Sequence, residues 1–296
     1  MIFILIPVHN RIQATLECLK CINNQTYKNF NIIIIDDGST DNTKSIIKEK
    51  YPDVTILKGD GNLWWTGAMY KGVKYILERA KNDDFILSIN NDVIFDKNYL
   101  EILYNTSLKH KRALVGSICK DLKDKKTVLD SGININWKKY SYFQTQYNES
   151  LDTTTQIDTI SGRGVLIPIE VFKKIGNYLK NKLPHYIADY EFGFRAKTAG
   201  FPLVMSYKAI VYSEKEFTGF RPQKKILSFK EYWKKLFYIK SSSNILNHIH
   251  IVYLHCPKTS LKIFNIFYII FGNFYLLLKN IILYSLLKLN FIKTNE

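Results

Sequence analysis

Acidic residues in the segment HYIADYEFGFRAKTAG have the types and spacing of a site for proton transfer. Asp189 and Glu191 flank Tyr190 at the expected start of a helix. The helix dipole favours carboxylates in a first turn, so capping alone can explain them. The functional interpretation makes Asp189 a general base that removes a proton from an attacking hydroxyl. Arg195 lies one turn after Glu191 and is expected to form a structural ion pair with it.

Two further acidic motifs follow apolar runs. In IIIIDDGSTDNT, a tight turn and a helix cap explain the Gly-Ser-Thr sequence but not the two carboxylates of Asp36 and Asp37. A carboxylate there can accept the N3–H of a uracil-like base. In SINNDVIF, Asp92 is a candidate ligand for Mg²⁺ or Mn²⁺ bridging two phosphates. Asn91 can reach a ribose hydroxyl, and a plain Asn-Asp turn is the alternative.

The segment GDGNLWWTGAMYKGV places two adjacent tryptophans between a glycine-rich turn and a helical pattern. Gly61 and Asn62 belong to the turn, and we expect the helix to begin at Thr66, after Trp64 and Trp65. At least one indole ring is expected to pack into the core. The other can form a wall of the donor pocket, because aromatic rings pack against the C–H face of a sugar. The N-terminal amides of the helix would then point toward a diphosphate.

The elements that must position these residues alternate between apolar runs and helical patterns. Apolar runs indicate strands buried on both faces, here at 2–8, 31–36, 54–58, 84–90 and 113–118. Helical spacing indicates helices at 11–23, 41–50, 66–80, 98–110, 169–175 and 189–199. This alternation predicts an α/β fold with a parallel sheet and helices on both faces. Ligands of such sheets bind beyond the carboxyl ends of the strands, where the polar clusters HNR, DDGSTD, GDGN and NND stand.

Composition limits the remaining possibilities. The 296 residues carry a formal net charge of +16, which favours an anionic partner such as a nucleotide, a nucleic acid or a membrane face. Four cysteines are too few for a disulfide scaffold, and the Cys18–Cys21 pair falls late in an expected helix, unlike a redox motif. The start MIFILIPVHN lacks a basic segment, so we expect no signal peptide and a cytoplasmic, reducing environment.

The composition changes from residue 226 onward, where lysines alternate with aromatic residues. A nearly apolar segment follows Leu261. A spanning helix needs ~20 mainly apolar residues, and Ile263–Leu278 falls just short of that length. We therefore expect a basic, aromatic-rich helix that lies on an anionic membrane. Packing against the catalytic domain and a true membrane span are the alternatives.

In their order and spacing, PVHNR, DDGSTD, NND, GRGVLIP and DYEFGFRAKTAG resemble glycosyltransferase family 2 over residues 2–213. The resemblance implies a GT-A fold, with a nucleotide-binding half at 1–120 and an acceptor-binding half at 121–225. A helical, membrane-associating extension at 226–296 would follow this catalytic domain. The resemblance also implies a nucleotide-diphosphate sugar donor of the UDP or dTDP type, a divalent metal (Mg²⁺ or Mn²⁺) and inversion at the anomeric carbon.

Single positions take roles from this resemblance. Asp189 matches the catalytic base, and Asp92 matches the metal ligand. The donor-binding residues are then expected to be Pro7, His9, Asn10, Arg11, Asp37, Gly61, Asn62, Trp64, Trp65 and Asn91. The acceptor-side or supporting residues are expected to be Gly162, Arg163, Tyr190, Glu191 and Arg195.

This chain departs from the family pattern at the metal site. The family motif usually carries more acid, whereas NND offers the single carboxylate of Asp92. Many relatives have a histidine near the end of the domain, where this chain has Tyr-Ser-Glu ending at Glu214. We expect metal binding to be weak, to borrow Glu214, or to be less central than usual. None of this affects Asp189.

The sequence therefore predicts an inverting glycosyltransferase of the hexosyltransferase type. Its acceptor would be a glycan or lipid-linked glycan in surface-polysaccharide biosynthesis, of the capsule or O-antigen kind, at the inner face of the cell membrane. A polyprenyl-phosphate glycosyltransferase is an alternative, and it would not need Asp189 because its acceptor has no hydroxyl proton. A second alternative is a non-enzymatic basic protein that binds membranes or nucleic acid. Nucleic-acid-binding motifs are absent from the sequence, so we expect no nucleic-acid partner.

Overall fold

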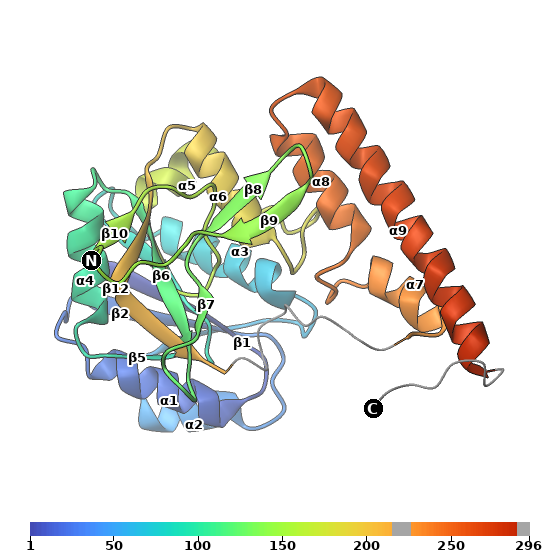
Figure 1. The fold of residues 1–296 in the computed structure, drawn as a ribbon. Helices are drawn as coiled ribbons and strands as arrows, with labels where there is room; N and C mark the ends of the chain where they lie inside the picture. Colours follow the sequence, from blue (N-terminus) through green and yellow to red (C-terminus); the bar gives the residue numbers. More distant parts are fainter. Residues whose placement is uncertain (215–225, 289–296) are drawn as a thin grey trace. The chain divides into compact units, whose positions relative to one another are not determined.

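The computed structural model describes residues 1–214 and 226–288, which divide into two compact units (Figure 1). Unit 1 holds residues 1–135 and 142–214, and unit 2 holds Asn136–Ser141 together with residues 226–288. The predicted domain boundary after residue 225 falls at the gap between the described ranges. Residues 215–225 of the predicted catalytic domain and residues 289–296 of the predicted extension lie outside the described residues.

Strands and helices alternate through the first half of unit 1, as the apolar pattern predicts. They are β1 (Ile2–Val8), α1 (Ile12–Asn23), β2 (Phe30–Asp36), α2 (Thr43–Lys50), β3 (Thr55–Lys58), α3 (Trp64–Leu77), β4 (Phe85–Ser88), β5 (Ile94–Phe95), α4 (Tyr99–Lys109) and β6 (Leu114–Asp121). The second half adds β7 (Val128–Asp130), β8 (Ile133–Asn136), β9 (Ser141–Gln144), β10 (Thr153–Thr154), β11 (Val165–Pro168), α5 (Ile169–Ile175), α6 (Ala188–Thr198) and β12 (Leu203–Ser213).

One large sheet has the strand order β10-β12-β6-β11-β4-β1-β2-β3, with β5 paired to β12 and β7 paired to β6. The pairs that join β1 to β2, β1 to β4, β2 to β3, and β6 to β12 are parallel. β11 lies between β4 and β6 and runs antiparallel to both. The sheet is therefore mostly parallel, as expected for a GT-A fold, and β11 from the second half of unit 1 lies antiparallel in its middle.

Helices cover both faces of this sheet because the strand residues alternate in direction. Ile4 of β1 shares a buried cluster with Leu19 of α1 and Leu103 of α4. Its neighbour Leu5 belongs to the cluster on the opposite face, with Met69 of α3. Burial of each such side chain contributes about 1.5–3 kcal/mol to folding. The two clusters hold the carboxyl ends of β1, β2 and β4 at one edge of the sheet.

Unit 2 is helical. It contains α7 (Phe229–Phe237), α8 (Ile245–His255) and α9 (Thr259–Lys288), so the predicted extension forms three helices over its described part. The Asn136–Ser141 turn between β8 and β9 packs with these helices, and the Tyr140 hydroxyl lies 2.9 Å from Nδ1 of His248. Trp137 and Tyr140 contact the small cluster of Val252, Cys256 and Ile269.

Candidate functional site

The polar clusters at the ends of β1 and β2 are hydrogen-bonded to each other. The Asn10 amide N–H donates to Ser39 Oγ at 2.8 Å, and Asn10 Oδ1 accepts the Thr40 N–H at 2.8 Å. Nδ1 of His9, which is exposed, lies 2.6 Å from the Asp37 carbonyl oxygen. Because the two strands are parallel neighbours, their carboxyl ends meet. The structure thus brings the predicted HNR and DDGSTD residues together.

Asp37 organises the loop that follows β3. Its buried carboxylate accepts the Gly61 N–H on Oδ1 at 2.8 Å and the Trp64 N–H on Oδ2 at 3.1 Å. Gly38 makes this approach possible, because a Cβ at its φ of +73° would lie 2.9 Å from the Gly61 Cα. The sequence suggested Asp37 as a ligand for a base. In the structure these two oxygens already hold backbone amides, and a carboxylate has about four lone-pair sites in all.

The helix α3 begins at Trp64 rather than at the expected Thr66. The bond from the Trp64 N–H to Asp37 fixes this start. Trp64 has a φ of +56°, a backbone conformation that bulky residues rarely adopt. Residues in such strained conformations are frequent at functional sites. Its ring lies against the His185 ring, with 6.3 Å between centroids.

Trp65 connects the two halves of unit 1. Its ring packs edge-on against Tyr178 and contacts the core cluster on the α3 side of the sheet. Its indole Nε1–H donates at 3.2 Å to Oδ1 of Asn90, the first residue of the NND motif after β4. A Cβ on Gly162 would lie 2.6 Å from Cζ2 of Trp65, so the ring rests on that glycine. Trp65 is therefore the ring that faces inward, and both tryptophans remain only partly buried.

The predicted metal ligand Asp92 is engaged by an arginine. Its Oδ2 accepts Nη1–H of Arg11 at 3.0 Å. The two residues are 81 positions apart, and the sequence did not predict this ion pair. The side chain of Asn91 is buried and donates to Thr15 Oγ1 at 2.9 Å. Within residues 1–214 and 226–288, no group of three His, Cys, Asp or Glu side chains could hold a metal ion together. Asp92 fits a divalent cation only as one carboxylate beside donor phosphates, which is a common arrangement for Mg²⁺.

The predicted base Asp189 is held from two sides. Its Oδ2 accepts the Gly162 N–H at 2.7 Å, and its Oδ1 accepts the Tyr190 N–H at 3.0 Å. Burial raises the pKa of this carboxyl to about 6, although the two N–H bonds lower it. Ile187, just before α6, has φ +59°, an unusual value for a β-branched residue. The Gly162 contact places Asp189 beside Trp65.

The other acceptor-side residues surround this carboxylate. The Arg163 guanidinium contacts the Cys119 thiol and interacts electrostatically with the carboxylates of Asp130 and Asp92. The ring of Tyr190 lies 5.6 Å from that of Tyr142, and burial raises the pKa of the Tyr190 hydroxyl well above its usual value. The sequence gave no indication of Cys119 or Asp130, because no motif marks them and only the fold brings them to Arg163.

The expected ion pair between Glu191 and Arg195 forms. Arg195 donates from Nε and Nη2 to the two carboxylate oxygens of Glu191, each at 2.8 Å. The same guanidinium donates to the carbonyl oxygens of Ile175 and Asn177 at 2.6 and 3.1 Å. Because Glu191 is fully buried, the pair fastens α6 to the segment that follows α5.

Two predicted donor residues, Pro7 and Asn62, take part in local contacts near the ends of β1 and β3. Pro7 lies inside β1, paired with Ile35 of β2. Asn62 is exposed, and its N–H donates to Asp60 Oδ1 within the turn after β3.

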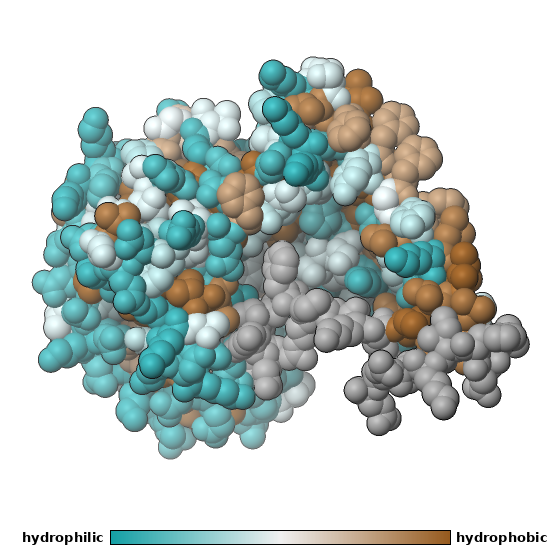
Figure 2. Space-filling model, in the orientation of Figure 1, coloured by the Kyte–Doolittle hydropathy of each residue, from teal (hydrophilic) through white to brown (hydrophobic). Residues whose placement is uncertain are grey.

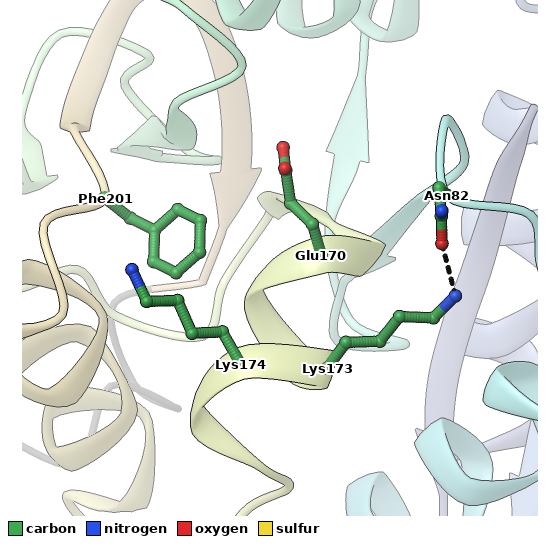
Figure 3. A pocket seen from close by; sticks show the side chains of 5 residues that line it. All are labelled: Asn82, Glu170, Lys173, Lys174 and Phe201. Carbon is green, nitrogen blue, oxygen red and sulfur yellow. Dashed lines mark hydrogen bonds between the residues drawn. The ribbon is translucent and has the colours of Figure 1, made fainter.

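A pocket of about 510 Å³ lies at the opposite edge of the sheet (Figure 3). Its lining residues are Asn82, Glu170, Lys173, Lys174 and Phe201. Asn82 precedes β4 and Phe201 precedes β12, so the pocket faces the amino ends of these parallel strands. Ligands of such sheets bind at the carboxyl ends, so we do not assign the chemistry to this pocket.

Relatives in sequence are glycosyltransferases by name. Residues 3–176 match the family described as glycosyl transferase family 2. An uncharacterized glycosyltransferase of Rickettsia conorii is 34% identical over 105 residues, which cover 34% of this chain and 16% of the relative. The amylovoran biosynthesis glycosyltransferase AmsB of Erwinia amylovora is 27% identical over 103 residues, or 33% of each chain. The N-acetylglucosaminyl-diphospho-decaprenol L-rhamnosyltransferase of Mycobacterium tuberculosis is 22% identical over 195 residues, or 59% of this chain and 63% of the relative.

Solved structures share the fold. A mannosyltransferase from Pyrobaculum calidifontis, in complex with GDP-Man and Mn²⁺, aligns with a TM-score of 0.58 and 13% identity, covering 94% of this chain and 72% of its own. GalNAc-T7 with UDP, GalNAc and Mn²⁺ aligns with a TM-score of 0.59 and 13% identity, covering 89% and 53%. The chain matches only about a sixth of the length of the relatives from Rickettsia conorii, Rickettsia bellii and Rickettsia felis. The family match over more than half of the chain and the shared fold together establish that the chain belongs to glycosyltransferase family 2 and has a GT-A fold.

Proposed function

We propose that this chain transfers a sugar from a nucleotide-diphosphate donor to a hydroxyl group of a glycan, with inversion at the anomeric carbon. The observation that carries the proposal is the environment of Asp189. Its carboxylate is held by the Gly162 amide beside Trp65, and burial raises its pKa to about 6. A carboxyl with this pKa is ionised at neutral pH and is a stronger base than an exposed aspartate.

The reaction is a single displacement. Asp189 accepts the proton of the acceptor hydroxyl while that oxygen attacks the anomeric carbon, and the bond from this carbon to the diphosphate breaks on the opposite face. The Asp37 bonds to Gly61 and Trp64 hold the donor loop in one conformation before the donor binds. A fixed loop aligns the two substrates, and alignment supplies much of the rate.

Asp92 would hold a divalent cation, Mg²⁺ or Mn²⁺, and that cation would offset charge on the leaving diphosphate. Two structural neighbours contain Mn²⁺ together with a nucleotide or nucleotide sugar. In this chain the cation must compete with Arg11 for the Asp92 carboxylate. The basic Arg11 side chain is suited to contact a phosphate once it leaves Asp92.

The acceptor in this proposal is a glycan carried on a lipid diphosphate at the cytoplasmic face of the membrane. One relative is named for transfer of rhamnose to such a lipid-linked sugar, and another for the biosynthesis of a polysaccharide. We extend the donor to the UDP or dTDP class on the sequence resemblance. The role that we propose for the chain is therefore in surface-polysaccharide assembly.

The deciding experiment is a panel of nucleotide sugars with and without Mn²⁺ or Mg²⁺, scored by thermal stabilisation and by slow donor hydrolysis. The matching donor should stabilise the wild-type chain and the Asp189→Asn variant alike. Transfer by Asp189→Asn should fall by about 10²- to 10⁴-fold, because the base is removed. The exposed Asp53→Asn change serves as the matched control and should leave transfer unchanged.

Two outcomes would redirect the proposal. No response to any nucleotide sugar would overturn it in favour of a non-enzymatic basic binding protein. Near-normal transfer by Asp189→Asn would favour a polyprenyl-phosphate acceptor, which has no hydroxyl proton to remove.

A further inference from the structure

The long helix α9 exposes a continuous apolar surface. Figure 2 shows hydrophobic residues gathered along this helix. Eleven large apolar side chains of α9 are at least 43% exposed: Ile263, Phe264, Phe267, Tyr268, Ile270, Phe271, Phe274, Tyr275, Leu276, Leu278 and Ile282. These residues run from Ile263 to Ile282, so this surface extends for about 29 Å along the 30-residue helix. An exposed apolar surface of this length calls for an apolar environment.

Two asparagines of α9, Asn265 and Asn280, point the other way, into unit 2. Asn265 is fully buried, and its Nδ2–H donates to the Trp137 carbonyl at 2.8 Å. Asn280 is hydrogen-bonded to both backbone groups of Leu227, accepting its N–H at 3.1 Å and donating to its carbonyl. A surface helix of a water-soluble protein turns mainly polar residues outward. On α9 large apolar residues dominate the outward face instead, which suits a helix whose outer face meets hydrocarbon.

Charge identifies the kind of apolar environment. Residues 226–288 contain eight lysines and a single acidic residue, Glu231. On α7 the exposed rings of Phe229, Trp233 and Phe237 follow one another along a single helix face. Lysines of the same helix stand among these rings, and Lys230 and Lys234 are exposed. Exposed aromatic rings among lysines are typical of a surface that binds the headgroup region of anionic lipids.

The contacts of α9 also determine how such a helix can lie. The stretch Thr259–Leu287 is long and apolar enough to cross a membrane by length and composition. However, α9 is bonded to the rest of unit 2 at Asn265 and again at Asn280, about 22 Å further along. Leu277 packs against α7 through Tyr232 and Leu236. A span would draw the α7 lysines toward hydrocarbon, at a cost of roughly 2.5–3.5 kcal/mol each near the bilayer centre.

We infer that α9 lies in the plane of an anionic membrane, with its outer apolar face in the lipid and its asparagine face on unit 2. The inference deepens the membrane part of the proposed function and rests on that part alone. It does not depend on sugar transfer, so its failure can be told apart from failure of the catalytic proposal.

The first test is flotation of the full chain with vesicles of phosphatidylglycerol and phosphatidylcholine. The variant replaces two exposed, stacked rings of the outer face, Phe267→Gln with Phe271→Gln. Vesicle binding should fall at least tenfold, while donor hydrolysis stays at the wild-type rate. The matched control is Phe143→Gln, because Phe143 of unit 1 is similarly exposed, and it should bind as the wild type does. Equal binding by the wild type and the double variant would overturn the inference.

Light scattering without lipid distinguishes a second copy of the chain as the occupant. The inference would be contradicted if the wild type is a dimer, the double variant is a monomer, and neither binds vesicles. That result would assign the apolar face to self-association. A monomer that binds vesicles supports it.

Cysteine labelling separates the in-plane helix from a span. Single cysteines at exposed Ser260 and Ser285, near the two ends of α9, are placed in a Cys21→Ser background. The other native thiols are buried. With sealed vesicles and a membrane-impermeant maleimide outside, both positions should react. Protection of only one end would show a span and overturn the in-plane geometry.

Discussion

At the residue scale, Asp189 is subject to opposing influences on its pKa. Burial disfavours its charged form, whereas the N–H groups of Gly162 and Tyr190 favour it. Burial has the larger effect, so the pKa rises to about 6 from an ordinary 3.8. The carboxylate is therefore ionised at neutral pH, and its pKa is close enough to neutral pH for it to accept a proton effectively.

The pH dependence of transfer should follow from this pKa. A base works in its deprotonated form, so kcat/KM should be level above pH 7 and fall about tenfold per pH unit well below pH 6. Initial rates at subsaturating donor and acceptor across pH 4.5–8.5 measure the profile. A profile without an inflection between pH 5 and 7 would argue against Asp189 as the base.

The same residue should carry a stability cost. Because the folded-state pKa lies above the unfolded value, the ionised carboxylate destabilises the fold, fully above about pH 6 and less as pH falls toward 4. Asp189→Asn should therefore raise the free energy of unfolding at pH 8 by about 1–2 kcal/mol, with the gain shrinking at pH 4. Urea unfolding at the two pH values measures this. A variant that is less stable at pH 8 would contradict the assigned environment.

At the element scale, the start of α3 and the start of α6 meet at Gly162. Trp65 of α3 lies against this glycine. The N–H of Gly162 donates to the carboxylate of Asp189 in the first turn of α6. The position of the donor loop and the position of the base therefore both depend on the backbone at Gly162. A small change there should disturb catalysis more than folding.

Gly162→Ala tests this coupling. The new methyl would lie 2.6 Å from Cζ2 of Trp65, so the ring or Asp189 must move. We expect transfer to fall about 10²-fold, since misplacing reacting groups by about 1 Å can cost that much. The measurement is kcat beside the melting temperature. Gly272→Ala is the control, because a Cβ there meets nothing within 4 Å, and it should leave kcat unchanged.

The ion pair of α6 should matter for stability. Glu191→Gln leaves the partly buried Arg195 without its counter-charge, and loss of one partner from a buried pair costs about 3 kcal/mol. Denaturant unfolding measures the loss. The double change with Arg195→Gln should cost less than the sum of the two single changes. Additive losses would mean that the two side chains act independently.

At the scale of the whole molecule, the net charge of +16 acts together with the apolar face of α9. Lysines attract the anionic surface at long range, whereas apolar burial acts only on contact. The two contributions therefore respond differently to ionic strength.

Vesicle binding should weaken with salt but persist. Raising NaCl from about 0.05 to 0.5 M should reduce affinity for phosphatidylglycerol vesicles by tenfold or more, because the Debye length shrinks to a few ångströms. Residual binding at high salt should disappear in the Phe267→Gln, Phe271→Gln variant. Flotation at several salt concentrations measures both effects. If high salt released the wild-type chain from the vesicles completely, the apolar face of α9 would make no contribution to membrane binding.

Much of this protein was predictable from local patterns. Apolar runs indicate β1, β2 and β4, and helical spacing indicates the helices that cover them, because burial on two faces leaves a periodic signature. Order and spacing of short motifs identify the family. Asp189 and Asp92 stand out because carboxylates at such positions require an explanation. The pairing of Glu191 with Arg195 follows from helical spacing alone.

Tertiary structure decided which of these residues meet and how they are charged. The Arg11–Asp92 pair, the Asp37 bonds to the α3 start and the contact of Trp65 with Gly162 join residues far apart in sequence. The inward direction of Asn265 and Asn280 also appears only when α9 is packed on its neighbours. Sequence determines which groups are present and how neighbours along the chain are spaced. Distances between remote groups, and the burial that shifts a pKa, exist only after the chain has folded.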